Sequence, residues 1–175
     1  ELKILSLPSP GALNPMAEPK SPTPVSLTLV AMNDSWKYYQ DQTAPPGNWH
    51  QPDFGDGLWD EGAALLAMES SELPSPKNTL LQLGSRTFYF RTHFEWSPEI
   101  APGRLQLWSI IDDGVIFYLN GNEALRIGIP SGVDSHHEML AGRNIIDATL
   151  EGPFTIDPGL LKPGDNVLAA EVHQV

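Results

Sequence analysis

Four acidic side chains gather in one short, glycine-rich stretch of the sequence: Asp53, Asp56, Asp60 and Glu61. Carboxylate oxygens on a flexible loop are the hard ligands that Ca²⁺ prefers in proteins. Their spacing differs from that of an EF-hand loop, so the stretch predicts a structural calcium site of another kind. The alternative is an acidic loop that is solvated and holds no ion.

A carbohydrate site needs an aromatic ring for the apolar face of a pyranose and planar polar groups for its hydroxyls. Trp96, which follows an apolar run at a loop, and Tyr39 are candidate platforms. Arg126 and Asn120 are candidate hydrogen-bonding partners. Each of these side chains has a structural alternative, which is to pack in the core or to shape a turn.

Two histidines, His136 and His137, lie in a long segment after Pro130, with Asp134 and Glu138 beside them. Neighbouring side chains in an extended segment point to opposite sides, so the two imidazoles are poorly placed to chelate one metal ion together. We expect them to shape a ligand site if this loop covers one end of the fold. A surface loop without a ligand is the alternative.

Catalytic motifs are absent from the sequence, which has no Gly-x-Ser-x-Gly elbow, no His-Glu-x-x-His and no phosphate-binding glycine loop. Carboxylates are abundant, but none lies in a recognisable acid/base setting. Asp112 and Asp113 precede Gly114, where turn chemistry competes with binding a metal or a sugar hydroxyl. The sequence therefore predicts a chain that is not an enzyme.

The charge balance excludes several classes of partner. The 175 residues hold 22 Asp and Glu against ten Lys and Arg, a net charge of −12. Binding of nucleic acid depends on clustered cations, and an anionic membrane surface would repel this chain. There is no cysteine and no apolar run long enough to span a membrane. The first residue is Glu1 rather than Met, which suggests a processed or excised piece.

Alternating apolar and polar residues predict an all-β protein. Strands are expected at residues 25–30, 87–94, 104–111, 115–119, 122–127 and 166–173. Asp113-Gly114 and Asn120-Gly121 are hairpin dipeptides, so residues 105–127 are predicted to form a three-stranded meander. Residues 61–70 are compatible with one short helix. Six prolines in residues 1–24 predict a linker or arm that is neither helix nor central strand, followed by one domain over residues 25–175.

Five segments taken in order carry a resemblance to a known family. They are residues 36–39 (WKYY), 48–59 (NWHQPDFGDGLW), 89–94 (YFRTHF), 112–121 (DDGVIFYLNG) and 164–174 (GDNVLAAEVHQ). Together they resemble the galactose-binding-like jelly-roll domain, similar to accessory domains of secreted bacterial proteins and to the sugar-binding domain of family 2 glycosidases. The resemblance implies a jelly-roll β-sandwich and a non-catalytic carbohydrate-binding role, secreted or at the cell surface, and it adds weight to a structural calcium ion.

One departure from the family concerns the end of the chain. A further strand usually follows the stretch that matches residues 171–174, but here the sequence stops at Val175. An open C-terminal edge is therefore expected, through which copies could associate. The alternatives are a truncated piece, or pairing of that edge by the proline-rich arm. The competing function is an extracellular interaction or assembly module without glycan affinity, or the supporting domain of a larger hydrolase.

Overall fold

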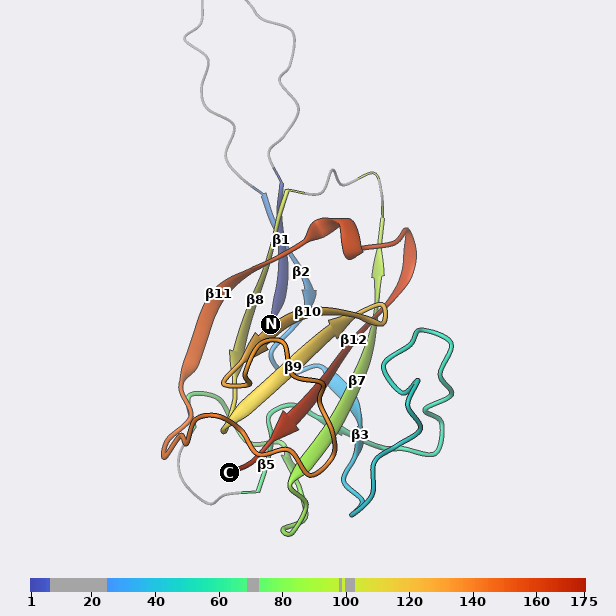
Figure 1. The fold of residues 1–175 in the computed structure, drawn as a ribbon. Coiled ribbons are helices and arrows are strands. Elements are labelled where there is room, and N and C mark those ends of the chain that lie inside the picture. Colours follow the sequence, from blue (N-terminus) through green and yellow to red (C-terminus); the bar gives the residue numbers. More distant parts are fainter. Residues whose placement is uncertain (7–24, 69–72, 98, 100–102) are drawn as a thin grey trace, which may run out of the picture.

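Two antiparallel sheets face each other in the computed structural model, which describes residues 1–6, 25–68, 73–97, 99 and 103–175. The smaller sheet has the strand order β11-β8-β1-β2. Its strands are β1 (Leu2–Ser6), β2 (Val25–Val30), β8 (Arg104–Ile110) and β11 (Leu150–Ile156). In Figure 1 part of the larger sheet runs diagonally in front of β1 and β8, so the molecule has two layers.

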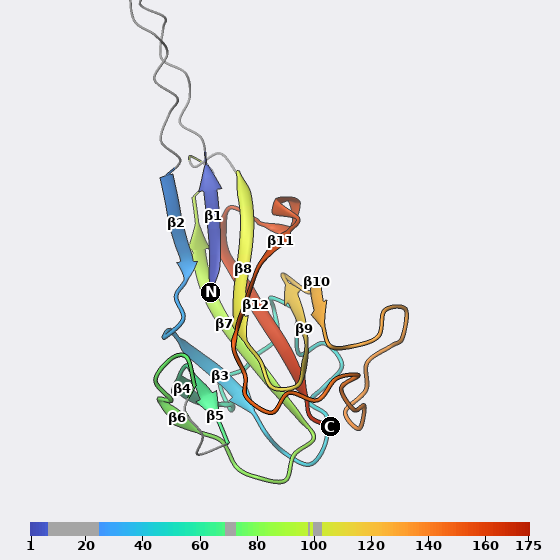
Figure 2. The same cartoon turned by 90° about the vertical axis from the view of Figure 1, so that its left-hand side faces the viewer.

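The larger sheet has the order β10-β9-β12-β7-β3-β4. Its strands are β3 (Ser35–Tyr39), β4 (Asp60–Ala63), β7 (Thr87–Trp96), β9 (Gly114–Leu119), β10 (Asn122–Ile127) and β12 (Gly164–His173). Figure 2 shows the small parallel pair of β5 (Leu66–Ala67) and β6 (Thr79–Leu80) beside β4. The only helical turn among the described residues is η1 (Pro158–Leu160), and no helix there is long and apolar enough to cross a membrane.

Apolar side chains fill both faces of the larger sheet. Between the two sheets, even-numbered residues of β12 such as Leu168 and Ala170 pack against Ile4 and Leu107 of the smaller sheet. On the opposite face, Val167 and Ala169 pack beneath the loops before β4 and after β10. This pattern explains why β12 is buried over nearly its whole length, because side chains of alternating parity enter different cores.

The strand predictions at residues 25–30, 87–94, 104–111, 115–119, 122–127 and 166–173 are confirmed, as is the all-β sandwich. The turn at Asn120-Gly121 is also confirmed, with positive φ values of 52° and 83° that the two residues tolerate. The predicted helix over 61–70 is wrong, because the described part of this stretch pairs as β4 and β5 instead.

The predicted meander over residues 105–127 is wrong at its first turn. β8 belongs to the smaller sheet and β9 to the larger one, so Asp113-Gly114 lies in a crossover between layers. The carboxylate of Asp113 accepts hydrogen bonds from the amides of Ile145 and Val175 at this corner. A dipeptide that favours reversal of the chain does not determine which sheet receives the next strand.

The predicted linker over residues 1–24 is wrong for its first six residues. Leu2–Ser6 form β1, which lies between β8 and β2 in the centre of the smaller sheet. Leu2 and Ile4 are almost completely buried, and the prolines begin only at Pro8. Residues 7–24 lie outside the described residues.

The expected open C-terminal edge is not formed either. β12 pairs with β7 along Gly164–His173 and with β9 along Leu168–His173, so it is a central strand. The outer strands of the two sheets are β10, β4, β11 and β2. Association of copies stays a prediction, but it would have to use one of those strands or a loop surface.

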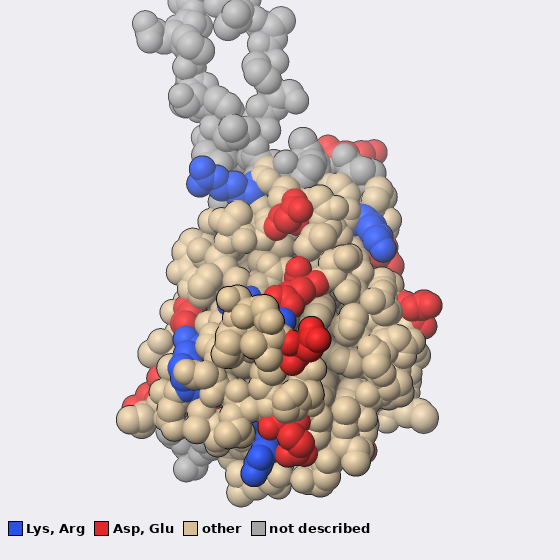
Figure 3. All heavy atoms as spheres, viewed as in Figure 1, with Lys and Arg blue, Asp and Glu red and all other residues tan. Residues whose placement is uncertain are grey.

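Charged side chains are spread over the face of the molecule that Figure 3 shows. On the face in Figure 3, acidic side chains are scattered, and basic ones lie beside several of them. The described residues of this face form no continuous basic patch. The exclusion of nucleic acid as a partner stays a prediction from the net charge.

The central position of β1 gives a first prediction. Ile4→Ala should lower the free energy of unfolding by about 2–5 kcal/mol, because it leaves a cavity between the sheets. Leu83→Ala, at a side chain that is 83% exposed, should change it by about 0.5 kcal/mol or less. Urea denaturation of both variants measures the difference, and equal stabilities would contradict the assignment of β1 to the core.

Candidate functional site

The loop between β3 and β4 is fastened to the outer face of the larger sheet by one buried guanidinium. Arg91 on β7 is completely buried, and its Nε donates a hydrogen bond of 2.8 Å to Oδ2 of Asp56. Its Nη1 donates to the carbonyl oxygens of Trp49 and Gln51, over 2.5 and 3.0 Å. The guanidinium also lies 5.3 Å from the ring centroid of Phe54. One side chain thus fixes the loop at several points.

Aromatic rings pack where this loop meets the sheet. Trp49 lies against Tyr89 and Tyr118, with ring centroids 4.9 and 5.6 Å away. Tyr39 lies 5.3 Å from Trp59 and 6.2 Å from Tyr89. Tyr39 therefore contributes to a structural cluster, and the structure does not present it as a free platform for a sugar.

A buried polar cluster lies beneath the same loops. The hydroxyl of Tyr118 donates to Oε1 of Glu171 over 3.0 Å. Nδ1 of His173 is 3.0 Å from the carbonyl oxygen of Met139, which only accepts, so this nitrogen carries a proton. Its Nε2 has no hydrogen-bond partner among the described residues and lies 3.7 Å from Oε1 of Glu171.

The carboxylate and imidazole of this cluster resemble an acid/base pair only in composition. Glu171 is 4% exposed and His173 is 0% exposed, so both side chains are enclosed by the described residues around them. Burial alone would raise the pKa of Glu171, but hydrogen bonding and the proximity of His173 outweigh it and hold the pKa below its usual value. Burial raises the pKa of Tyr118, which keeps its hydroxyl protonated as a donor. The cluster therefore links β12 to β9 and to the loop that carries Met139.

Trp96 is not the exposed platform that the sequence predicted. β7 continues through Trp96, which pairs with Gly164 of β12, and the indole enters the core between the sheets with 8% exposure. Asn120 is also structural: its side-chain amide donates to Asn166 and to the carbonyl of Leu160. Both predictions failed because the strand pairing that decides their orientation involves residues more than 40 positions away.

The two histidines are oriented differently, as expected from their adjacency. His136 is exposed, whereas His137 is half-buried and stacks on Tyr89 with a centroid separation of 5.9 Å. Nδ1 of His137 is 3.2 Å from the hydroxyl of Tyr89. The loop that carries them covers the outer face of the larger sheet, with Met139 in the core beneath it.

Arg126 is the predicted ligand residue that borders a hollow. Its guanidinium pairs with both carboxylate oxygens of Glu123, over 2.6 and 2.7 Å, and donates to the carbonyls of Pro130 and Val133. These bonds hold the loop after β10 beside the strand. We call the resulting depression, of about 550 Å³, the 130-loop hollow. It is lined by Glu123, Arg126, Ile129, Ser131, Gly132, Val133 and Asp134.

The four acidic candidates for calcium are not gathered into one site. Asp56 is engaged by Arg91, and Glu61 forms an ion pair of 2.9 Å with Lys37. Asp53 and Asp60 are exposed. Across the described part of the chain, no group of three or more acidic, histidine or cysteine side chains is close enough to hold a metal ion. Calcium binding stays an untested expectation.

No protein-family model matches the chain, and no curated protein matches it significantly. A β-glucuronidase from glycoside hydrolase family 2 superposes on 81% of the chain with a TM-score of 0.50 and 15% identity. The β-glucuronidase of an uncultured Clostridium superposes on 83% with a TM-score of 0.50 and 13% identity.

The likeness shows the fold. It confirms the predicted all-β sandwich, whose fold is similar to that of a small domain in family 2 glycosidases. The chain spans 13% and 22% of the lengths of these two enzymes. It therefore corresponds to one module of a much longer protein in each case.

The buried guanidinium gives a second prediction. Arg91→Met should destabilise the fold by about 3 kcal/mol, because the carboxylate of Asp56 and two loop carbonyls lose their partner. Lys37→Met, which removes a surface ion pair, should change stability by about 1 kcal/mol or less. Hydrogen exchange of residues 48–59 should increase in the first variant alone. Unchanged protection of that loop would contradict the role given to Arg91.

His50 gives a prediction on pH. Burial lowers the pKa of His50, against the opposing charge of Glu171, and its ring stacks on Tyr118 at 4.6 Å. The unfolded chain therefore binds this proton more readily, so the contribution is complete above the usual pKa of about 6.5 and is lost as the pH falls below it. His50→Gln should flatten the fall in melting temperature between pH 7.5 and 5. His136→Gln, at an exposed ring, should leave the curve unchanged.

Proposed function

We propose that the chain is a non-catalytic, carbohydrate-binding accessory module of a larger secreted or cell-surface bacterial protein. Its fold is that of a small domain within two family 2 glycosidases, and this observation carries the proposal. The enclosure of Glu171 and His173 supports a non-catalytic role, because the carboxylate and imidazole that lie together are shielded from substrate. Likeness of fold alone does not assign an activity, so the site has to be argued separately.

We place the carbohydrate site in the 130-loop hollow. Arg126 is fixed there by Glu123 and two carbonyls, so its guanidinium is ordered before a ligand arrives. The carboxylates of Glu123 and Asp134 accept hydrogen bonds from sugar hydroxyls, and Ser131 both donates and accepts.

The lining of the hollow also sets the expected affinity. Its described lining holds no aromatic ring, so binding lacks the stacking that strengthens many sugar sites. Weak, polar recognition is therefore expected, of the kind that becomes useful when several modules act together.

A glycan array of the full chain tests this function, with calcium and with a chelator in parallel. Binding to a defined class of polysaccharide is expected, and Asp134→Ala should weaken it about tenfold because a charge-assisted hydrogen bond is lost. Asp147→Ala, at an exposed carboxylate outside the hollow, should leave affinity unchanged. A blank array with a folded protein would reject the proposal. Loss of binding in the presence of chelator would support the predicted calcium site.

A second candidate function is an interaction module without glycan affinity. Large apolar side chains stand almost fully exposed at Leu58, Leu83 and Ile146. A protein contact of this kind requires such side chains to meet in one continuous patch. Sedimentation velocity over a range of concentrations separates the two functions, because self-association reduced by Leu83→Ser together with a blank array would favour the second.

A further inference from the structure

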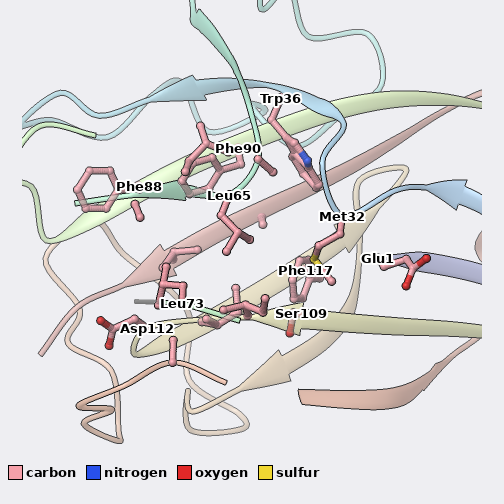
Figure 4. A pocket seen from close by; sticks show the side chains of 18 of the residues that line it. Glu1, Met32, Trp36, Leu65, Leu73, Phe88, Phe90, Ser109, Asp112 and Phe117 are labelled. Carbon is pink, nitrogen blue, oxygen red and sulfur yellow. The ribbon is translucent and has the colours of Figure 1, made fainter. Parts of the chain in front are cut away.

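A cavity of about 190 Å³ lies between the two sheets, at the end of the sandwich where β1 begins. Figure 4 shows Phe88 and Phe90 of β7, Trp36 of β3 and Phe117 of β9 around it, with Leu65 beside them. Its lining is mainly apolar. This cavity is separate from the 130-loop hollow, and the two share no lining residue.

The cavity exists because the two sheets do not end at the same level. β1 begins at Leu2, opposite Leu107, whereas β8 continues to Ile110. Beyond Leu107, therefore, β1 no longer lies across from the inner face of the larger sheet. Residues 64–68 line this region from the side.

The burial of side chains along the central strands also shows that the inner face is less covered at this end. On β7, Phe94 is 7% exposed, but Phe90 on the same face is only half-buried. On β12, Leu168 is 3% exposed, but Val172 on the same face is only half-buried. Inward-facing side chains of central strands are normally covered completely, so these residues present apolar surface that a ligand can cover.

One polar atom stands out in this lining. Ser109 continues the inward row of β8 after Leu105 and Leu107, and it is 5% exposed. Its Oγ has no hydrogen-bond partner within the described part of the chain. A buried hydroxyl without a partner is costly, so a ligand that pairs with it gains both affinity and orientation.

We propose that this cavity binds a small, mainly apolar molecule that carries one hydroxyl or carbonyl group, which pairs with Oγ of Ser109. An engineered apolar cavity of about 150 Å³ in another protein binds benzene, so a cavity of about 190 Å³ has room for one ring with a short substituent. The ring packs among Phe88, Phe90 and Phe117. The proposal does not depend on the carbohydrate function.

Calorimetric titration of the full chain with benzyl alcohol, and with toluene as the probe without a hydroxyl, tests the proposal. Both probes should bind at one saturable site. Ser109→Ala should weaken benzyl alcohol about fivefold and change toluene by less than twofold, because only the alcohol uses the serine. Failure of both probes to saturate would overturn the proposal, and an equal loss for the two probes would overturn the assigned role of Ser109.

Filling the cavity provides the second arm. Ala170→Leu places extra carbon in the space beside Leu168, and Val172→Phe does so from a half-buried position, so one variant remains if the other does not fold. Each folded variant should lose binding of both probes. Leu80→Ala, at an exposed side chain that is not part of the cavity lining, should bind as the parent does. Binding that survives both filling variants would place the ligand elsewhere and overturn the proposal.

Discussion

The buried guanidinium of Arg91 is the interaction on which the outer face of the larger sheet depends. A charge without exposed surface is tolerated only when it is paired, and here the loop before β4 supplies the carboxylate of Asp56 and the backbone carbonyls. With that loop in place, Trp49 and Trp59 cover Val167 and Ala169. Without it, the part of the outer face that lies beneath Trp49 and Trp59 would be open to water. The charge thus orders a loop that has no regular secondary structure of its own.

Because both faces of the larger sheet are covered, its central strands differ from half-exposed strands in their pattern of polar and apolar residues. In an antiparallel sheet with one solvated face, polar residues alternate with apolar ones. β9 is instead buried at all six positions, from Gly114 to Leu119. On β12 the outward positions hold Glu171 and His173, which find partners beneath the loops. The polar residues of these strands are therefore part of a second core, and this accounts for the burial of Glu171 and His173.

The sequence predicted the positions of the strands better than it predicted which strands pair with one another. Alternation is a local property, so the strands at residues 87–94 and 122–127 could be located, and Asn120-Gly121 identified its own hairpin. The layer change at Asp113-Gly114 depends on pairing with distant strands, which no local pattern contains. The same reason applies to Trp96, whose neighbour in the sheet is Gly164. β1 was missed because the prolines that follow dominated the composition of the first 24 residues. Of the candidate site, Arg126 borders the 130-loop hollow, whereas tertiary contacts decide the roles of Trp96 and Asn120.

The central place of β1 has a consequence for the order of assembly. Leu2 lies opposite Leu107, so the smaller sheet closes a loop of more than one hundred residues before its middle strand is paired on both sides. Closing such a loop costs chain entropy before the contacts between β1 and β8 stabilise the structure. Folding is therefore slower than in proteins built from local contacts. During synthesis, β1 leaves the ribosome long before β8 exists. Its apolar side chains cannot pack against β8 until more than half of the domain has been synthesised.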